Sequence, residues 1–167
     1  MKIKGFLLRF SLVALILLGI VWFLNSQRQP AAEATATEVQ TTVSITGKVT
    51  NKTDAQACLT QLKANLAAAT NEDGEAYVAT LVESARKATK KEMGQFFKEY
   101  DLSHQLLSFN VVKQEDTSMI IEAQQKTINL GKKKYRNHIT QARHTFVKVA
   151  DVWLIKETSM TNTDFID

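Results

Sequence analysis

The sequence of 167 residues has few of the residues that would place it in several structural classes. It contains one cysteine, one proline and six glycines. One thiol cannot form an intramolecular disulfide, so a disulfide-rich scaffold is excluded. The small share of proline and glycine excludes a collagen-like or fully disordered chain. This length, with 44% hydrophobic residues, predicts one folded domain plus an appendage.

The predicted folded part also lacks an excess of charge of either sign. The formal net charge is +4, and residues 1–53 account for all of it with six basic and two acidic residues. Residues 54–167 hold 15 basic and 15 acidic residues. A nucleic-acid-binding domain is expected to be basic itself. We therefore expect no nucleic-acid partner.

A long apolar run near the N-terminus predicts a transmembrane helix. Residues 6–24, FLLRFSLVALILLGIVWFL, would span about 28 Å as a helix, close to the hydrocarbon thickness of a bilayer. Basic residues are concentrated before the uncharged core of the run. The positive-inside rule therefore places residues 1–5 in the cytoplasm of a bacterial cell and the C-terminal domain outside its membrane. A cleaved signal peptide is the alternative, with small-x-small sites at residues 32–36.

Residues 25–51 are predicted to be a linker and residues 52–167 the folded domain. The linker is rich in Ala, Thr, Gln and Glu, although alternating apolar residues also fit a short strand between residues 41 and 49. In the domain, apolar residues spaced by three and four predict three helices. The first runs from an N-cap at Asp54 to about Ala69, and the others lie at about 77–85 and 87–100.

Four extended runs follow, at about 107–111, 117–130, 135–149 and 152–161. Short turns between them indicate an antiparallel meander. A parity change between Ile139 and Ala142 predicts a bulge in the third run, which would bend the sheet. The predicted fold is α+β: three N-terminal helices packed on a curved four-stranded antiparallel sheet that forms a cone, preceded by the transmembrane helix.

Three stretches carry a resemblance to a known superfamily: LKANLAAATNEDGEAYVATL (62–81), FFKEYDL (96–102) and TFVKVADVWLIKET (145–158). Together with the order of elements, they resemble the nuclear transport factor 2-like superfamily, also called cystatin-like or SnoaL-like, over roughly residues 52–165. The resemblance implies a pocket between sheet and helices that is catalytic in some members and core in others. A membrane-anchored version is also similar in architecture to the assembly component of type IV secretion and conjugation machines.

We expect no metal, no cofactor and no catalytic residue. His138 and His144 would share one face of a strand about 20 Å apart, too far to bind one zinc ion. Asp101, Asp116 and Asp151 fall at helix ends or turns, where exposure is the norm, so no buried base is evident. Cys58 lies on an apolar helical face and is interpreted as a core residue.

Two groups of residues are candidates for contact with ligands or partners. The pocket-lining candidates are aromatic and histidine side chains, which are equally typical of a core: Tyr77, Phe96, Phe97, Tyr100, His138, His144 and Trp153. The candidates for contact with anionic groups belong to the sequence GKKKYR, and such a loop is ordinarily only solvated: Lys132, Lys133, Lys134 and Arg136.

Two functional hypotheses follow. The first is a single-pass, membrane-anchored bacterial protein that displays an extracytoplasmic interaction or assembly domain, for example in a secretion or conjugation complex. Its partners would be the membrane, other proteins and a second copy of the chain. The second is a small-molecule-binding or isomerase/dehydratase-like enzyme that uses the cone pocket. An open pocket with a buried acid would favour the second hypothesis, and a filled cone the first.

Overall fold

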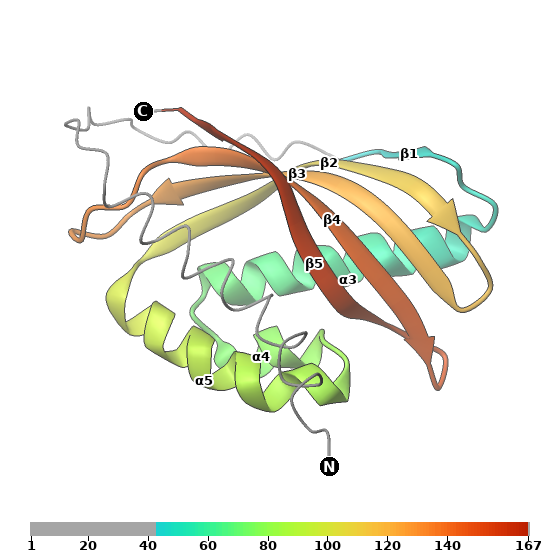
Figure 1. Cartoon of the computed structure of the whole chain (residues 1–167), viewed down its shortest axis with the longest axis horizontal. Helices are drawn as coiled ribbons and strands as arrows, with labels where there is room; N and C mark the ends of the chain where they lie inside the picture. The colour runs from blue at the N-terminus through green and yellow to red at the C-terminus, as the bar shows by residue number, and fades with distance from the viewer. Residues whose placement is uncertain (1–42, 167) are drawn as a thin grey trace, which may run out of the picture.

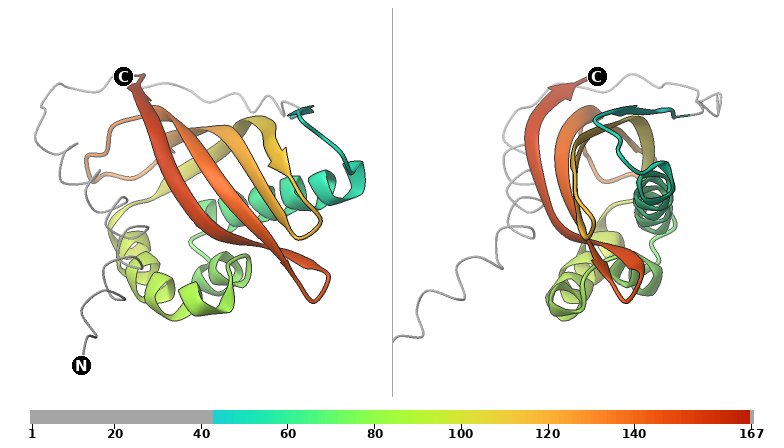
Figure 2. Two further views of the ribbon diagram at one scale, coloured as in Figure 1. Left: turned by 45° about the vertical axis from the view of Figure 1, so that its right-hand side comes forward. Right: turned by 90° about the vertical axis from the view of Figure 1, so that its right-hand side faces the viewer.

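The computed structural model describes residues 43–166, so the predicted membrane segment at 6–24 lies outside the described residues. The elements in chain order are β1 (Ile45–Gly47), α3 (Lys52–Thr70), α4 (Gly74–Ala79), α5 (Glu83–Glu99), β2 (Leu102–Gln114), β3 (Ser118–Asn129), β4 (His138–Val149) and β5 (Val152–Phe165). The strands form one sheet in sequence order. Figure 1 and Figure 2 show this sheet curving around α3, with α4 and α5 below the C-terminal half of that helix.

The prediction of a four-stranded antiparallel sheet is wrong, because a fifth strand makes the sheet mixed. β1 pairs in parallel with β2, with Ile45 opposite Phe109 and Gly47 opposite Val111. Parallel neighbours need a long crossover, and the three helices between β1 and β2 supply it. β1 falls within the stretch that the sequence assigned to the linker, inside the range 41–49 where alternating apolar residues fit a short strand. Gly47 has φ +90° and no room for a Cβ, because an added one would lie 2.2 Å from the carbonyl oxygen of Val111.

The predicted fold also included a transmembrane helix, and the structure contains none that could serve as one within residues 43–166. No helix in this range combines the length and the hydropathy needed to cross a bilayer. The three helices that are described belong instead to the folded domain.

The sheet bends at bulges, and one register shift, at Gln141/Ala142, lies next to the predicted position, but its extra residue is in β5 and not in β4. β4 pairs with β3 in unbroken register from Ser118–Val147 to Thr127–His138. The register shifts lie in β2, around 106–108 and 111–113, and between β4 and β5, where β5 carries the additional residues Lys156 and Thr161. Even-numbered residues of β4 from 138 to 146 are all buried on one face. The additional residues in β2 and β5 increase the local bend and so produce the concave sheet.

Side-chain caps begin the first two helices. The cap of α3 is Asn51 rather than Asp54, since the Asn51 side chain accepts a hydrogen bond from the backbone N–H of Asp54 at 3.1 Å. Asp73 caps α4 through the N–H of Ala76. α4 is shorter than predicted and α5 begins earlier. The reason is tertiary, because the chain between them runs beside β5, where Val82 N–H bonds to Ile155 C=O and Ile155 N–H to Thr80 C=O.

The core fills the space between α3 and the concave face of the sheet. α3 packs against β2 and β5, and its buried side contributes eight residues. Among the side chains almost wholly removed from solvent are Leu62, Phe109, Ile121 and Phe146, each at most 1% exposed. Cys58 is part of this core, as its helical position predicts. α5 is attached differently: it packs mainly on α4 and buries one residue, Met93.

Candidate functional site

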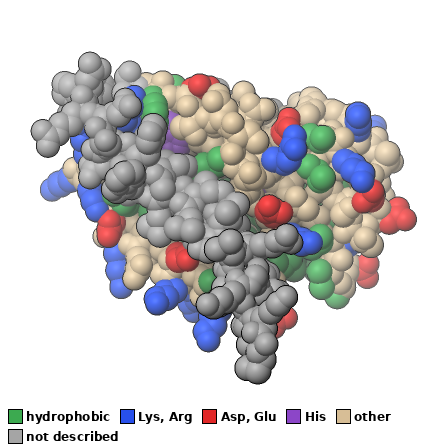
Figure 3. Space-filling view, in the orientation of Figure 1, with side chains coloured by type: hydrophobic (Ala, Val, Ile, Leu, Met, Phe, Trp, Pro, Cys, Tyr) green, Lys and Arg blue, Asp and Glu red, His purple; other side chains and the backbone are tan. Residues whose placement is uncertain are grey.

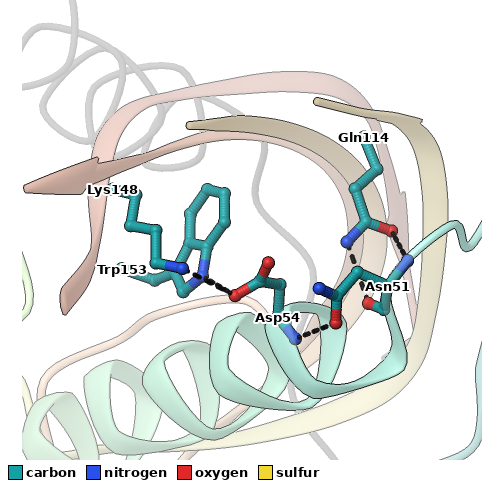
Figure 4. Close-up of polar contacts among 5 residues, drawn as sticks. All are labelled: Asn51, Asp54, Gln114, Lys148 and Trp153. Carbon is teal, nitrogen blue, oxygen red and sulfur yellow. Dashed lines mark hydrogen bonds and ion pairs between the residues drawn. The ribbon is translucent and has the colours of Figure 1, made fainter. Parts of the chain in front are cut away.

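At one end of the cone, Asp54 joins helix α3 to the β4–β5 hairpin (Figure 4). Its Oδ1 accepts hydrogen bonds from the indole Nε1 of Trp153 at 2.9 Å and from Lys148 Nζ at 3.2 Å. The indole hydrogen bond, assisted by Lys148, holds the Asp54 pKa below its ordinary value, against the opposing effect of burial. Asp54 is therefore ionised at neutral pH and tied in place, which makes it a poor proton acceptor.

A second set of hydrogen bonds fixes the start of α3 to the sheet. The Gln114 side chain at the end of β2 accepts from the backbone N–H groups of Thr50 and Asn51 and donates to the carbonyl of Asn51 at 2.9 Å. This amide thereby closes the chain between β1 and α3 onto β2 (Figure 4). The Gln114 amide and the Asp54 carboxylate therefore both fix the start of α3 to the sheet, which is a structural role.

Cys58 lies one turn further along α3 and cannot act as a nucleophile. Burial, with the negative charge of Asp54, raises its pKa to about 12. The thiolate is the reactive form of cysteine, and it is not populated at neutral pH with this pKa. The interior next to Asp54 thus offers neither a general base nor a thiol nucleophile.

The histidines form a polar strip along the concave face instead of lying at an exposed rim. His138 and His144 are 4% and 3% exposed. His144 Nε2 lies 2.8 Å from Gln125 Nε2, and its Nδ1 lies 2.9 Å from Thr158 Oγ1. Burial lowers the His144 pKa to about 4. This ring is therefore neutral at physiological pH and satisfied by uncharged neighbours.

The other two histidines lie at the opposite end of the same strip. His104 Nδ1 lies 3.1 Å from Thr127 Oγ1, and burial with the neighbouring His138 lowers its pKa to about 4. His138 Nδ1 lies 2.9 Å from the carbonyl of Arg136, so this nitrogen is the protonated one. Between the two ends lies Thr140, whose buried Oγ1 has no hydrogen-bond partner within residues 43–166.

Most of the predicted aromatic candidates meet in one cluster, but not around a cavity. The Phe96 ring lies 5.1 Å from Tyr100 and 6.4 Å from Phe97, and Phe97 lies 6.3 Å from Tyr77. Tyr135 extends the cluster to His138, with ring centroids 5.2 Å from Tyr100 and 5.8 Å from His138. Trp153 and His144 lie elsewhere, in contact with Asp54 and Phe146 respectively. The seven candidates therefore do not form one pocket.

Two open surface hollows lie along α5. One is lined by the 72–75 turn and by Lys90, Gly94, Phe97 and Lys98, and the other by α5 residues 87–98 alone. Gly94 leaves the surface of α5 indented, since an added Cβ there would meet nothing within 4 Å. Within residues 43–166 there is also no group of three or more His, Cys, Asp or Glu side chains placed to bind a metal ion.

The four basic candidates lie in the β3–β4 loop, next to the end of α5. Lys133 forms an ion pair with Glu99, and its Nζ lies 4.4 Å from the centre of the Tyr100 ring. The Arg136 guanidinium lies 3.6 Å from the centre of the Phe165 ring. Lys132 and Lys134 are exposed. The loop is thus held to the domain by two of its cations and presents the other two to solvent.

Sequence reasoning missed the contact between Asp54 and Trp153, which joins residues 99 positions apart. It also mistook Asp54 for the cap. The spacing of Asn51 three residues before Asp54 is the local signal for the cap and was available. No local signal marks the partner of Trp153, since its indole is brought to Asp54 by the fold alone.

The concave mixed sheet with a long helix against it is the fold of NTF2-like and cystatin-like proteins, and solved structures agree. A cystatin-like protein of unknown function from Nostoc punctiforme is 10% identical with a TM-score of 0.57, covering 66% of this chain and 91% of that one. A dehydratase candidate of the NTF2-like family from Streptomyces avermitilis is 12% identical with a TM-score of 0.56, covering 64% and 93%. At these identities the likeness shows the fold alone.

The chain belongs to the family of the C-terminal domain of anti-sigma-I factor RsgI9, whose model matches residues 60–166. Bd1075 of Bdellovibrio bacteriovorus shares the fold at 14% identity and a TM-score of 0.54, with 64% of this chain covered. The chain spans 39% of the length of that protein. No curated protein matches the chain in sequence.

Proposed function

We propose that the folded domain is a non-enzymatic interaction module, displayed outside a bacterial membrane by the apolar segment at residues 6–24. The observation that carries the proposal is the burial of large apolar side chains inside the cone. Where the superfamily resemblance implies a pocket, Phe109, Phe146 and Trp153 are at most 3% exposed. The carboxylate beside them, Asp54, is held ionised by Trp153 and Lys148. A buried apolar interior whose neighbouring carboxylate is held ionised offers no base of raised pKa for general acid–base catalysis.

The family match supports the same proposal. The matching domain is named as the C-terminal part of an anti-sigma-I factor, and this name is not that of an enzyme. A role in the assembly of a secretion or conjugation complex remains a more specific hypothesis, which rests on the architecture alone.

A small-molecule function is the second candidate. Fold neighbours named as dehydratase and scytalone dehydratase candidates are consistent with it. The observation that favours it in this chain is the polar strip of Gln125, Thr140 and His144 on the concave face, where the Thr140 hydroxyl has no partner in the described structure. A polar group inside a core is ordinarily hydrogen-bonded, so a small polar ligand or a water molecule would complete it.

Topology is the first part of the test. The full chain with a C-terminal epitope tag is expressed in a bacterium, and spheroplasts are treated with protease. We expect the chain to stay in the membrane pellet after an alkaline carbonate wash. We also expect the protease added outside the spheroplasts to digest the tag. A tag that is protected until the cells are lysed would overturn the proposed orientation.

The second part separates the interaction module from the ligand pocket. A photo-crosslinking residue is placed in turn at exposed positions such as Ala64, Lys132 and Val149, and cells are irradiated. We expect discrete adducts at surface positions, unchanged when the interior is altered by His144→Gln. Absence of adducts at every surface position, together with a small polar molecule retained by wild type and lost in His144→Gln, would favour the second candidate.

A further inference from the structure

Positive charge is concentrated on one side of a domain whose overall charge is balanced. α5 and residues 131–136 together hold nine basic and three acidic residues. Because residues 54–167 are neutral overall, their remainder carries an equal excess of acidic residues. Figure 3 shows Lys and Arg side chains along the edge of the molecule where α5 and the β3–β4 loop lie in Figure 1, and others on the opposite side.

These two segments form one continuous surface. The ion pair between Lys133 and Glu99 joins the loop to the last turn of α5, and the Tyr135 ring packs on Phe96 and Tyr100 at 6.3 and 5.2 Å. Five lysines on it make no ion pair within residues 43–166: Lys87, Lys91, Lys98, Lys132 and Lys134. We call this surface, α5 together with residues 131–136, the basic face.

Exposed apolar side chains lie at the loop end of the basic face. Leu130, just before the lysines, is 58% exposed. Ile166 is 41% exposed, and its backbone N–H bonds to the carbonyl of Asn137 at the end of the same loop. Surfaces that bind at a bilayer interface typically combine large apolar side chains with lysines. The lysines contact anionic headgroups, and the apolar side chains enter the boundary of the acyl chains.

The length of chain between the domain and the apolar run keeps such a membrane within reach. Eighteen residues, 25–42, separate the apolar run from the first described residue. Fully extended, they span at most about 60 Å. A domain tethered at this range experiences a high effective concentration of headgroups. Each lysine near the headgroups raises the ratio of docked to undocked domain by about fivefold, so a few lysines suffice for docking.

We propose that the basic face docks on the anionic phospholipid surface of the bilayer that the N-terminal segment enters, so that the domain lies against the membrane. The proposal rests on the proposed membrane anchorage. It differs from protein binding in its chemistry, because the occupant is a layer of phosphate headgroups and docking requires lipid charge but no second protein.

The test uses the full chain reconstituted in vesicles of phosphatidylcholine alone or with 30% phosphatidylglycerol. Leu130→Cys carries an environment-sensitive fluorophore, and Val149→Cys, 51% exposed at the tip of the β4–β5 hairpin, is the matched control. Cys58 stays unlabelled because it is fully buried and burial raises its pKa to about 12. We expect a blue shift for the Leu130 label in anionic vesicles, reversed by about 0.5 M NaCl, and no shift for the Val149 label.

Charge variants then test which lysines are responsible. Lys132→Gln with Lys134→Gln should lower the ratio of docked to undocked domain by about 30-fold. Lys63→Gln with Lys156→Gln, which removes the same charge from exposed positions elsewhere, should leave the ratio unchanged.

Flotation of the vesicles distinguishes failure of the anchorage from failure of docking. If the chain floats with both vesicle types and the Leu130 label does not respond to lipid charge, docking is overturned, and an acidic protein or wall polymer becomes the occupant. If the chain floats with neither vesicle type, the proposed anchorage and the docking that depends on it both fall. If flotation itself requires phosphatidylglycerol and is lost in the Lys132/Lys134 variant, docking stands and the anchorage falls.

Discussion

At the residue scale, Thr140 has a buried hydroxyl without a partner in the described structure. It is 4% exposed, and its neighbours across the sheet are Gln125 and Thr163. Valine has nearly the same shape without the polar group, so Thr140→Val should raise the free energy of unfolding by about 1 kcal/mol. Urea denaturation at pH 7 measures the change. A loss of stability would instead show that a bound water or ligand satisfies the hydroxyl.

His144 gives the domain a sensitivity to acid. Its pKa lies at about 4 in the folded state and near 6.5 in the unfolded chain. Between these values the unfolded state binds more protons, so stability is complete above pH 6.5 and falls as the pH is lowered towards 4. From pH 7 to pH 5, His144 alone should cost about 2 kcal/mol.

His144→Gln should remove this share of the acid destabilisation, because glutamine does not titrate. The comparison is the difference in unfolding free energy between pH 7 and pH 5 for wild type and variant, so any uniform loss of stability cancels. His104 titrates in the same direction and remains in both proteins. An identical pH dependence for the two proteins would refute the assignment to His144.

At the element scale, the β4–β5 turn contains two non-glycine residues in the left-handed region. Ala150 has φ 47° and Asp151 has φ 66°. A two-residue hairpin loop of this kind favours Asn-Gly, because the left-handed conformation is sterically unfavourable for alanine and not for glycine. Ala150→Asn with Asp151→Gly should therefore stabilise the domain by about 1 kcal/mol.

Thermal unfolding of this double variant checks the turn. The control is Ala88→Gly on the exposed side of α5, where φ is helical and glycine should destabilise by about 1 kcal/mol. If both changes destabilise, the turn does not have the left-handed geometry in solution.

The elements that the sequence predicted well are those set by local pattern. α3 was predicted at 54–69 and observed at Lys52–Thr70. The two agree because the signals are local: the spacing of its apolar residues, and the sequence NEDG at 71–74 that ends the helix. The limits of α4 and α5 were missed, because Thr80 and Val82 bond to Ile155 of β5. β1 was missed as part of the sheet for the same reason, since its partner strand lies more than 60 residues away. The bulge was misplaced because Ile139, an apolar residue on the convex face, resembled a core position.

At the scale of the whole molecule, the candidate site could be predicted only in part. The sequence suggested that Phe96, Phe97 and Tyr100 belong together, and the structure places the first two on α5 and Tyr100 at its C-cap, with Phe96 in contact with both other rings. It could not show that Trp153 faces Asp54 at the other end of the cone, since that contact follows from closure of the sheet around α3. Whether the interior is open or filled depends on the fit of many side chains at once, which no single stretch encodes.

α5 should be less stable than α3. It buries Met93 alone, whereas α3 buries eight residues in the core. Few buried contacts permit local unfolding without loss of the core. In hydrogen–deuterium exchange of the full chain, amides at 88–95 should therefore exchange at least about 100-fold faster than those at 58–66.

Two variants separate local from global opening of the chain. Phe96→Ala removes a ring of the α5 cluster and should speed exchange in α5 while leaving α3 unchanged. Phe146→Ala, in the core, should cost about 3–5 kcal/mol and speed exchange in both helices. Equal protection of α3 and α5 in wild type would mean that the domain opens as one unit.

Because α5 carries much of the basic face, anionic vesicles should slow the hydrogen exchange of its amides, and neutral vesicles should not. This dependence on lipid charge links the local unfolding of the helix to its proposed role at the membrane.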